Sequence, residues 1–243
     1  MIAALFVPLF VVGGSAALPS FFVDTSKAKT VVDASYVNYN IDTGSLYNGM
    51  DFSDSKFRTL VSQLAPAYIR IGGTAVDSSF YFPSTPYLIG EPNLCAACGS
   101  GASAIGDAML TQIVDFMQAT DMNLLLDFNG EKTRFSPLGA WNPAINATPT
   151  LEWLEAHYSG KINFAYSIGN EPDLWENKVS STQMGKDAVT LKNLLKSYNV
   201  GREVFGPSWA GVNAHQAVDF LTEGVKGGLD GYTVHNYPYG GKE

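Results

Sequence analysis

Apolar and polar positions follow two alternating periods along the chain. Short runs rich in β-branched and aromatic residues predict buried strands, and apolar residues recurring three and four positions apart predict helices. On this pattern, strands are predicted at 36–41, 67–71, 124–128, 164–168, 204–206 and 231–235. Helices are predicted at 53–63, 107–117, 148–154, 182–197 and 215–223. Strands separated by helices of this length indicate parallel βαβ units.

Several of these elements carry more detailed expectations. The apolar side of the helix at 53–63 is predicted to comprise Phe57, Leu60, Val61 and Leu64, and that of the helix at 182–197 to comprise Met184, Ala188, Leu191 and Leu195. Asp107 is expected to cap the helix that it begins. The Pro- and Gly-rich stretch from Phe80 to Ser103 is expected to be a loop.

The order of strands and helices fits either an open doubly wound sheet or an eight-stranded barrel. An open sheet should carry a glycine-rich phosphate loop after its first strand, and the sequence has none there. Polar residues instead follow several strands, as in a barrel that builds its site from many strand ends: Asp42, Thr74, Asn129, Asn170, Glu171 and His235. The sequence therefore predicts an α/β protein, a (β/α)8 TIM barrel with about six of its eight β/α units in residues 18–243.

Composition narrows the classes of partner. The 243 residues are 46% hydrophobic and 16% charged, as in an ordinary globular domain. The net charge of −8, without any run of Lys and Arg, argues against nucleic acid and gives no support for a polyanionic substrate. No metal, nucleotide or other cofactor is implied. The sequence leaves open the oligomeric state and peripheral association with a membrane or matrix.

The first residues indicate export. Met1–Ala17 is almost entirely apolar or small, as in a secretory signal peptide, with a buried strand or a membrane anchor as the alternatives. The expected location is therefore extracellular or lysosomal. Asn146, in Asn-Ala-Thr within a Pro-flanked polar loop, then becomes a glycan acceptor. Cys95 and Cys98 could form a redox pair, half a metal site or a local disulfide, and the absence of a second ligand pair favours the disulfide.

The chemistry centres on the strand that begins at Phe164. Asn170 and Glu171 follow it directly, where a barrel strand opens into the pocket. A carboxylic acid at a rigid strand end, beside an amide that can hold a sugar hydroxyl, suits the general acid of a glycosidase. Trp175 is expected to add an aromatic surface of the kind on which sugars stack. The alternative is a solvated turn in which Asn, Glu and Pro only end a strand.

Three motifs occur in this order: Leu64-Ala-Pro-Ala-Tyr-Ile-Arg-Ile-Gly-Gly-Thr74 with Asp77, Ser167-Ile-Gly-Asn-Glu-Pro172, and Leu229-Asp-Gly-Tyr-Thr-Val-His-Asn-Tyr237. Together they resemble glycoside hydrolase family 79, the heparanase and β-glucuronidase group. The resemblance implies a TIM barrel with a small β-sandwich attached, and a retaining mechanism that uses two glutamates. It implies that Glu171 is the acid/base and that Asn170 holds the sugar 2-hydroxyl. Asp42 and Thr74 would line the sugar site, and His235 and Tyr237 would lie beside the nucleophile.

The sequence departs from that family in two ways. The family's nucleophile lies on a seventh strand, which is expected beyond Glu243, so the chain is expected to be a fragment without the nucleophile or the β-sandwich, and inactive alone. The basic stretches and the long linker of heparanase are also missing, which favours a smaller or less sulfated glucuronide. The predicted function is a secreted retaining glycosidase acting on β-linked glucuronides, in which the pKa of Glu171 is raised. A glycan-binding or inert product is the alternative, and a glycosidase for another hexose is a third.

Overall fold

Six parallel strands form the central sheet of the structure, a computed structural model that describes residues 37–83, 89–90, 103–132, 134–198, 200–211 and 213–237. The strands lie in the order β1-β2-β6-β7-β8-β9, and every neighbouring pair is parallel. Their bounds are β1 Tyr39–Asp42, β2 Tyr68–Gly72, β6 Asn123–Phe128, β7 Phe164–Ile168, β8 Glu203–Trp209 and β9 Gly231–Val234. The predicted strands are confirmed, although β8 is longer than expected.

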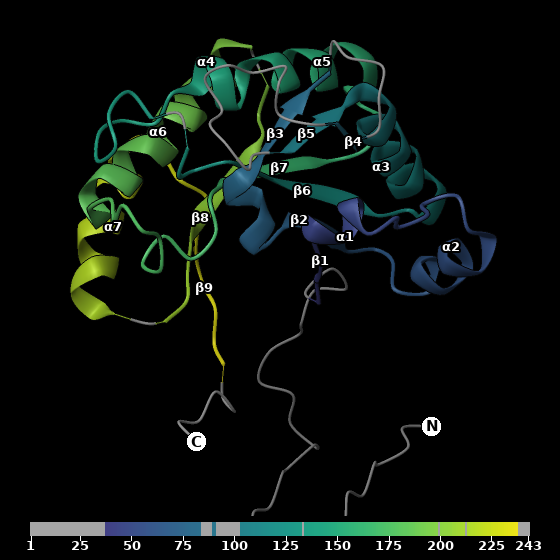
Figure 1. Cartoon of the computed structure of the whole chain (residues 1–243), viewed down its shortest axis with the longest axis horizontal. Coiled ribbons are helices and arrows are strands. Elements are labelled where there is room, and N and C mark those ends of the chain that lie inside the picture. The colour runs from purple at the N-terminus through teal and green to yellow at the C-terminus, as the bar shows by residue number, and fades with distance from the viewer. Residues whose placement is uncertain are drawn as a thin grey trace, which may run out of the picture. The chain divides into compact units, whose positions relative to one another are not determined.

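Helices cover one face of this curled sheet (Figure 1). They are α1 Gly44–Tyr47, α2 Ser55–Ser62, α3 Asp107–Thr120, α4 Pro143–Asn146, α5 Thr148–Tyr158, α6 Ser181–Ser197 and α7 Ala214–Gly227, with the 3₁₀ helix η1 at Thr74–Ser78. A parallel sheet that curls and carries its helices outside is the arrangement of a TIM barrel. The described residues therefore form an incomplete barrel of six β/α units, as predicted.

The core lies between the sheet and these helices. Alternate strand residues point outward, and Leu124, Leu126 and Phe128 of β6 are all fully buried there. The ring of Tyr166 on β7 stacks on that of Phe128, with centroids 5.6 Å apart. The predicted buried side of α6 is confirmed, because Met184, Ala188, Leu191 and Leu195 are each at most 4% exposed. On the opposite face of the sheet, one pocket is lined by both polar and apolar side chains, among them Arg70, Leu125 and Phe205.

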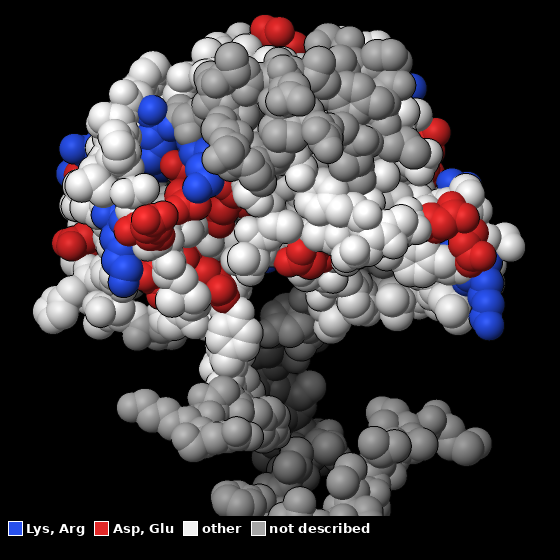
Figure 2. Space-filling model, viewed as in Figure 1, with Lys and Arg blue, Asp and Glu red and all other residues white. Residues whose placement is uncertain are grey.

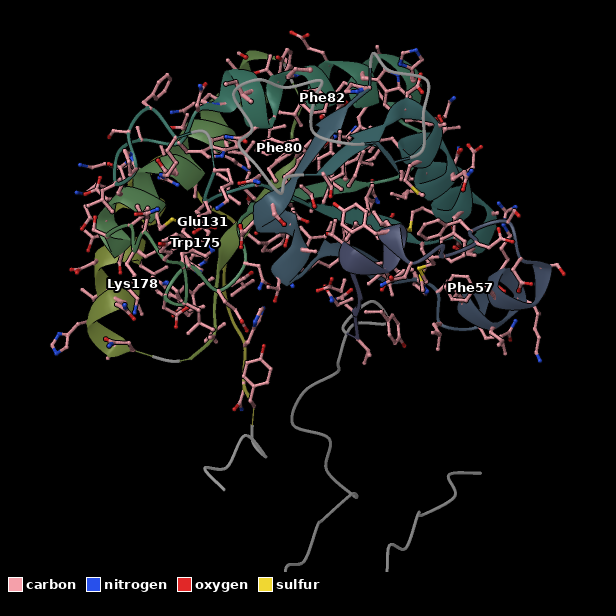
Figure 3. The ribbon with its side chains drawn as sticks, in the orientation of Figure 1. Phe57, Phe80, Phe82, Glu131, Trp175 and Lys178 are labelled. Atoms are coloured by element: carbon pink, nitrogen blue, oxygen red, sulfur yellow. The ribbon has the colours of Figure 1, made fainter. Side chains whose placement is uncertain are left out.

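The predicted apolar side of α2 is partly wrong. Val61 is buried, but Leu60 is 60% exposed and Leu64 is 43% exposed. The helix instead packs through Phe57, whose ring stacks on Phe116 of α3 with centroids 4.9 Å apart (Figure 3). The helix therefore packs through Phe57 and Val61 and leaves Leu60 exposed, so the periodicity of the sequence overestimated how much of its apolar side is buried.

Two local expectations in the middle of the chain are also wrong. Part of the stretch expected to be a loop forms a small sheet in the order β3-β5-β4, with β3 at Ser79–Phe82, β4 at Ile89–Gly90 and β5 at Ser103–Gly106. Phe80 is 2% exposed and packs beside Phe82 (Figure 3). Asp107 is the first residue of α3 and not its cap, because the N-cap residue is Gly106 and no side chain caps it. The prediction for Met1–Ala17 and that for Cys95 and Cys98 lie outside the described residues.

Candidate active site

The turn that follows β7 is held in an unusual backbone conformation. Gly169 has φ +73°, and Glu171 has φ +49°, a value that side-chain-bearing residues rarely adopt. A Cβ on Gly169 would lie 2.5 Å from the ring of Trp175, so only glycine fits there. The N–H of Glu171 donates to the carbonyl of Ser208 on β8 at 2.8 Å. Strain of this kind persists where surrounding structure fixes it, and it collects at functional sites.

Asp77, from η1, holds this turn from below. One of its carboxyl oxygens accepts the backbone N–H of Asn170 at 3.1 Å and the indole N–H of Trp175 at 2.8 Å, and the other accepts the N–H of Gly130 at 3.4 Å. Burial raises the pKa of Asp77 to about 8, against the opposing effect of these donors. Trp175 is 6% exposed, so the expected open stacking surface is wrong. The indole instead braces the turn beneath Glu171.

Arg70 supports the same turn from the inner face of the sheet. It forms an ion pair with Asp127, which is fully buried on β6. Its guanidinium also donates to the side-chain oxygens of Asn170 at 3.0 Å and Asn40 at 3.2 Å. Arg70 thus orients the side-chain amide of Asn170, which is expected to hold a sugar hydroxyl. Arg70 bonds to the oxygen of that amide and not to its N–H₂ group.

Glu171 lies above the turn and receives two side-chain hydrogen bonds. His235 Nδ1 lies 2.6 Å from its Oε1, and the hydroxyl of Tyr237 donates to the same oxygen. Burial raises the pKa of Glu171, but the hydrogen bonds from His235 and Tyr237 outweigh it and hold the pKa below its usual range. The prediction that the pKa of Glu171 is raised is therefore wrong for the described part of the chain. His235 and Tyr237 also contact the expected acid/base itself, a contact that the sequence did not predict.

These groups meet in one cleft at the carboxyl ends of the strands. The cleft has a volume of about 390 Å³ and is lined by all six residues predicted from the sequence. They are Asp42, Thr74, Asn170, Glu171, His235 and Tyr237. Asn40, Arg70, Gly73 and Asn236 complete its lining. Asn129, also noted at a strand end, instead donates to the carbonyl of Ser79 and does not line the cleft.

Two supporting residues, Arg70 and Asp77, were not assigned a role from sequence. Arg70 and Asp77 lie within the first motif, and a charged residue inside an otherwise apolar strand is a signal that could have identified Arg70. Asp77 and Trp175 are 98 positions apart, so nothing local in the sequence relates them. In the described part of the chain, no group of three or more His, Cys, Asp or Glu side chains could hold a metal ion.

The expected glycan acceptor does not lie in an exposed loop. Asn146 is the last residue of α4, and its side chain is 3% exposed. Its amide nitrogen donates to the carbonyl of Asn142 at 3.1 Å. A buried, hydrogen-bonded amide is not accessible for attachment of a sugar, so the expectation for Asn146 is wrong in this fold. No helix among the residues described is long and apolar enough to cross a membrane.

The fold and the cleft define the class as an incomplete TIM barrel that gathers polar side chains at the carboxyl ends of its strands. No protein-family model matches the chain. Heparanase of Bos taurus is 24% identical over 90% of this chain and 48% of its own length. Hyaluronoglucuronidase of Hirudo nipponia is 24% identical over 81% of this chain and 44% of its own.

A solved structure is similar to this chain in its fold. The 4-O-α-L-rhamnosyl-β-D-glucuronidase of Fusarium oxysporum 12S has a TM-score of 0.54 and 15% identity, over 85% of this chain and 45% of that one. The resemblance to the heparanase group is confirmed by the two sequence relatives, and the solved structure shows the same fold. It spans about half the length of the curated relatives it matches.

Proposed function

We propose that this chain carries the acid/base side of the active site of a retaining glycosidase acting on β-linked glucuronides. One observation supports this most directly: the cleft gathers Glu171 and the five other residues predicted from the sequence, which lie at the carboxyl ends of separate strands. Catalytic groups of TIM-barrel enzymes come from such strand ends. Export by the segment Met1–Ala17, to the extracellular space or the lysosome, belongs to the same proposal.

In the proposed mechanism, Glu171 acts twice. It first donates its proton to the glycosidic oxygen as a second carboxylate attacks the anomeric carbon, and the bond to the leaving sugar breaks. It then takes a proton from the water that releases the glycosyl-enzyme. The attacking carboxylate, about 5 to 5.5 Å from the acid in retaining enzymes, is assigned to a strand outside the described residues. Asn170, oriented by Arg70, is assigned to the sugar 2-hydroxyl.

The low pKa of Glu171 is consistent with this division of roles. His235 and Tyr237 give their hydrogen bonds to Glu171 in the described residues. A nearby second carboxylate would repel the ionised form of Glu171 and accept those hydrogen bonds itself, and both effects raise the pKa of Glu171. We therefore expect Glu171 to be protonated, as the first step requires, when the second carboxylate is present beside it.

The glucuronide is proposed from two observations. The curated relatives that the chain matches include a hyaluronoglucuronidase as well as a heparanase. Arg70 is the cation among the described residues that line the cleft, and a guanidinium favours a sugar that carries a carboxylate, although Arg70 is also paired with Asp127, and Asp42 and Glu171 lie in the same cleft. A glycosidase for another hexose would show no preference for the uronic acid in a panel of aryl glycosides.

Rescue by azide tests the proposal in a form of the protein that supplies the nucleophile. With an aryl β-glucuronide, whose leaving group needs little protonation, Glu171→Ala should accumulate a glycosyl-enzyme. Added azide needs no deprotonation, so it should restore turnover and give a β-glucuronyl azide. If Glu171 only ends a strand, the substitution will leave the rate nearly unchanged and azide will have no effect.

A non-catalytic glycan-binding role is the second candidate. Its support is that Asp42 and Glu171 are the carboxyl groups described in the cleft, and that Asp42 Oδ1 already accepts the N–H of Gly44 at 2.7 Å. This candidate would be favoured if a form of the protein that includes further strands binds methyl β-glucuronide but does not hydrolyse it. Hydrolysis by a longer form would exclude it.

A further inference from the structure

A buried ion pair joins the loop that follows β6 to α6, the helix that comes after the turn at the end of β7. Its members are Arg134 in the loop and Asp187 on the helix. Charged side chains of both signs lie on the surface in Figure 2, whereas those of this pair are only 1% and 2% exposed. A buried ion pair often stabilises a fold no more than apolar residues of similar size would. The contribution of this pair is therefore expected in the geometry that it fixes.

Arg134 holds the loop through all three of its side-chain nitrogens. Nε donates to the carbonyl of Gly139 at 2.8 Å, Nη1 donates to the carbonyl of Gly130 at 2.5 Å, and Nη2 donates to Asp187. Gly130 is buried, and a buried carbonyl needs a hydrogen-bond partner. A guanidinium presents its donors in a fixed planar fork, whereas the ammonium of a lysine is a single point of charge. Lysine could keep the ion pair but could not reach all three acceptors at once.

Asp187 holds the same loop from the side of the helix. Its Oδ1 accepts the backbone N–H of Trp141 at 3.0 Å and the side-chain amide of Gln183 at 2.8 Å, and its Oδ2 accepts from Arg134. Trp141 is buried, and its indole N–H donates to the carbonyl of Asn129 at 2.8 Å. The two ends of the loop are thereby tied to each other and to α6.

Gly130 connects this loop to the turn after β7. Its N–H donates to Asp77 at 3.4 Å, while its carbonyl accepts from Arg134. A Cβ on Gly130 would lie 2.7 Å from the ring of Trp175, so the loop and the indole are in close contact. Asp77 in turn accepts the N–H of Asn170. A shift of Gly130 would therefore displace both the acceptor of the Asn170 N–H and the ring that braces the turn.

We propose that Arg134 and Asp187 are positioning residues of the active site, which hold Gly130 against the turn and so fix where Asn170 and Glu171 lie. The inference rests on the proposed function, because it takes Asn170 and Glu171 as the groups that meet the sugar. Neither member of the pair lines the cleft, so both act through other residues.

Arg134→Lys in the 243-residue chain tests the proposal, because it keeps the charge and removes the planar fork. Native-state hydrogen exchange measures how often the N–H groups of Gly130 and Asn170 open. Both should exchange about 5-fold faster than in wild type, the effect of losing one hydrogen bond of ordinary strength. The pKa of Glu171, followed by carbon-13 NMR, should rise toward its usual value, because a displaced turn weakens the hydrogen bonds that Glu171 accepts. An ion pair that only stabilises the fold would leave this pKa unchanged.

Arg202→Lys is the matched control. Arg202 donates from Nε and Nη2 to the carboxylate of Glu155 at 2.9 and 3.0 Å, and it does not line the cleft. The control should lower the free energy of unfolding and leave both the exchange and the pKa unchanged. Equal effects of the two variants would show that only overall stability matters, and this would overturn the inference. No effect of Arg134→Lys on the exchange or on the pKa would also overturn it.

Gln183→Met keeps the proposal testable if Arg134→Lys does not fold. It preserves the length of the side chain and removes only the hydrogen bond to Asp187, which remains paired with Arg134. The same two N–H groups should then exchange about 2-fold faster, since one of the donors to Asp187 is lost. Unchanged exchange in a folded Gln183→Met variant would overturn the inference.

The azide rescue of Glu171→Ala tests the proposed function separately. If the rescue succeeds and Arg134→Lys leaves the exchange and the pKa unchanged, the inference fails and the proposed function stands. If the exchange and the pKa change as expected and the rescue fails, Arg134 and Asp187 still position the turn, and the proposed function is the part that is overturned.

Discussion

Two carboxyl groups lie on opposite sides of the turn after β7, and their surroundings shift their pKa values in opposite directions. Asp77, beneath the turn, is 6% exposed, and burial raises its pKa to about 8. Glu171, above the turn, is only partly buried, and the hydrogen bonds from His235 and Tyr237 keep its pKa below its usual range. The same functional group is thus neutral in one place and ionised in the other at pH 7.

The difference separates positioning from reactivity. Asp77 is bonded to backbone and indole N–H groups, and these contacts fix where Asn170 and the turn lie. Glu171 is hydrogen-bonded to two side chains, His235 and Tyr237, and Tyr237 is 60% exposed. Environments that push the pKa values of two carboxyls apart are typical of sites that assign them separate roles. Asp77 is therefore interpreted as a positioning residue and Glu171 as the reacting one.

Paired amide substitutions give the largest expected contrast. Each of Glu171→Gln and Asp77→Asn keeps the size of the side chain and removes its carboxyl. In a form of the protein that supplies the nucleophile, Glu171→Gln should lower kcat on a natural glucuronide by about 10² to 10⁴, the range of a general acid or base. Asp77→Asn should retain most of kcat, because an amide oxygen can still accept the N–H of Asn170. Steady-state kinetics of both variants measures the contrast, and equal losses would end the separation of roles.

Removal of the buried carboxyl should destabilise the fold. Asp77→Ala leaves the N–H of Asn170 without its acceptor, and Trp175 keeps only its 3.0 Å bond to the carbonyl of Asn170. Each buried donor left unsatisfied costs about 1 to 3 kcal/mol, so the free energy of unfolding should fall by about 2 to 4 kcal/mol. Urea unfolding of the 243-residue chain measures it. The exposed control Asp219→Ala should change the same quantity by less than about 0.5 kcal/mol, and a similarly small change for Asp77→Ala would contradict the assigned positioning role.

The strands, the order of the units and five of the six cleft residues could be predicted from sequence for a physical reason, and Tyr237 was predicted only from the family resemblance. Buried strands have short apolar runs, and polar residues that directly follow them must emerge at the same edge of a parallel sheet. Asn170 and Glu171 follow β7 in this way, and His235 follows β9. Their placement in one cleft needed no knowledge of the tertiary structure beyond the barrel itself.

The supporting contacts could not be predicted, because they depend on distant elements. Trp175 follows a predicted strand and resembles a sugar-stacking residue, but Gly130 and Gly169 leave room for its ring beneath the turn. The pKa of Glu171 depends on hydrogen bonds from residues 64 and 66 positions away. Burial of Asn146 depends on a four-residue helix whose sequence carries no strong periodicity.

The pH dependence of stability should show the buried carboxyl directly. Between about pH 4 and about pH 8, Asp77 is ionised in the unfolded chain and protonated in the folded one. The folded state then binds more protons, so the contribution of Asp77 to stability is full below about pH 4 and is lost as pH rises to about 8. The Tm of wild type minus that of Asp77→Asn should therefore fall across this window, by about 2 to 4 °C for each kcal/mol lost in a chain of this size. A difference that stays constant from pH 4 to 8 would show that the pKa of Asp77 is not raised.

The smallest expected effect comes from the rim of the cleft. Tyr237→Phe removes one hydrogen bond to Glu171 and keeps the aromatic ring, so the pKa of Glu171 should rise toward its usual value, and His235 still holds it partly down. Because Tyr237 is 60% exposed, the free energy of unfolding should change by less than about 0.5 kcal/mol. Carbon-13 NMR titration of the Glu171 carboxyl measures the pKa. Tyr198→Phe is the matched control, because the Tyr198 hydroxyl donates to Glu152 at 3.3 Å, away from the cleft. If Tyr237→Phe and Tyr198→Phe both leave the titration of Glu171 unchanged, the hydrogen bond from Tyr237 does not lower the pKa of Glu171. The difference between the pKa values of Glu171 and Asp77 would then not depend on Tyr237.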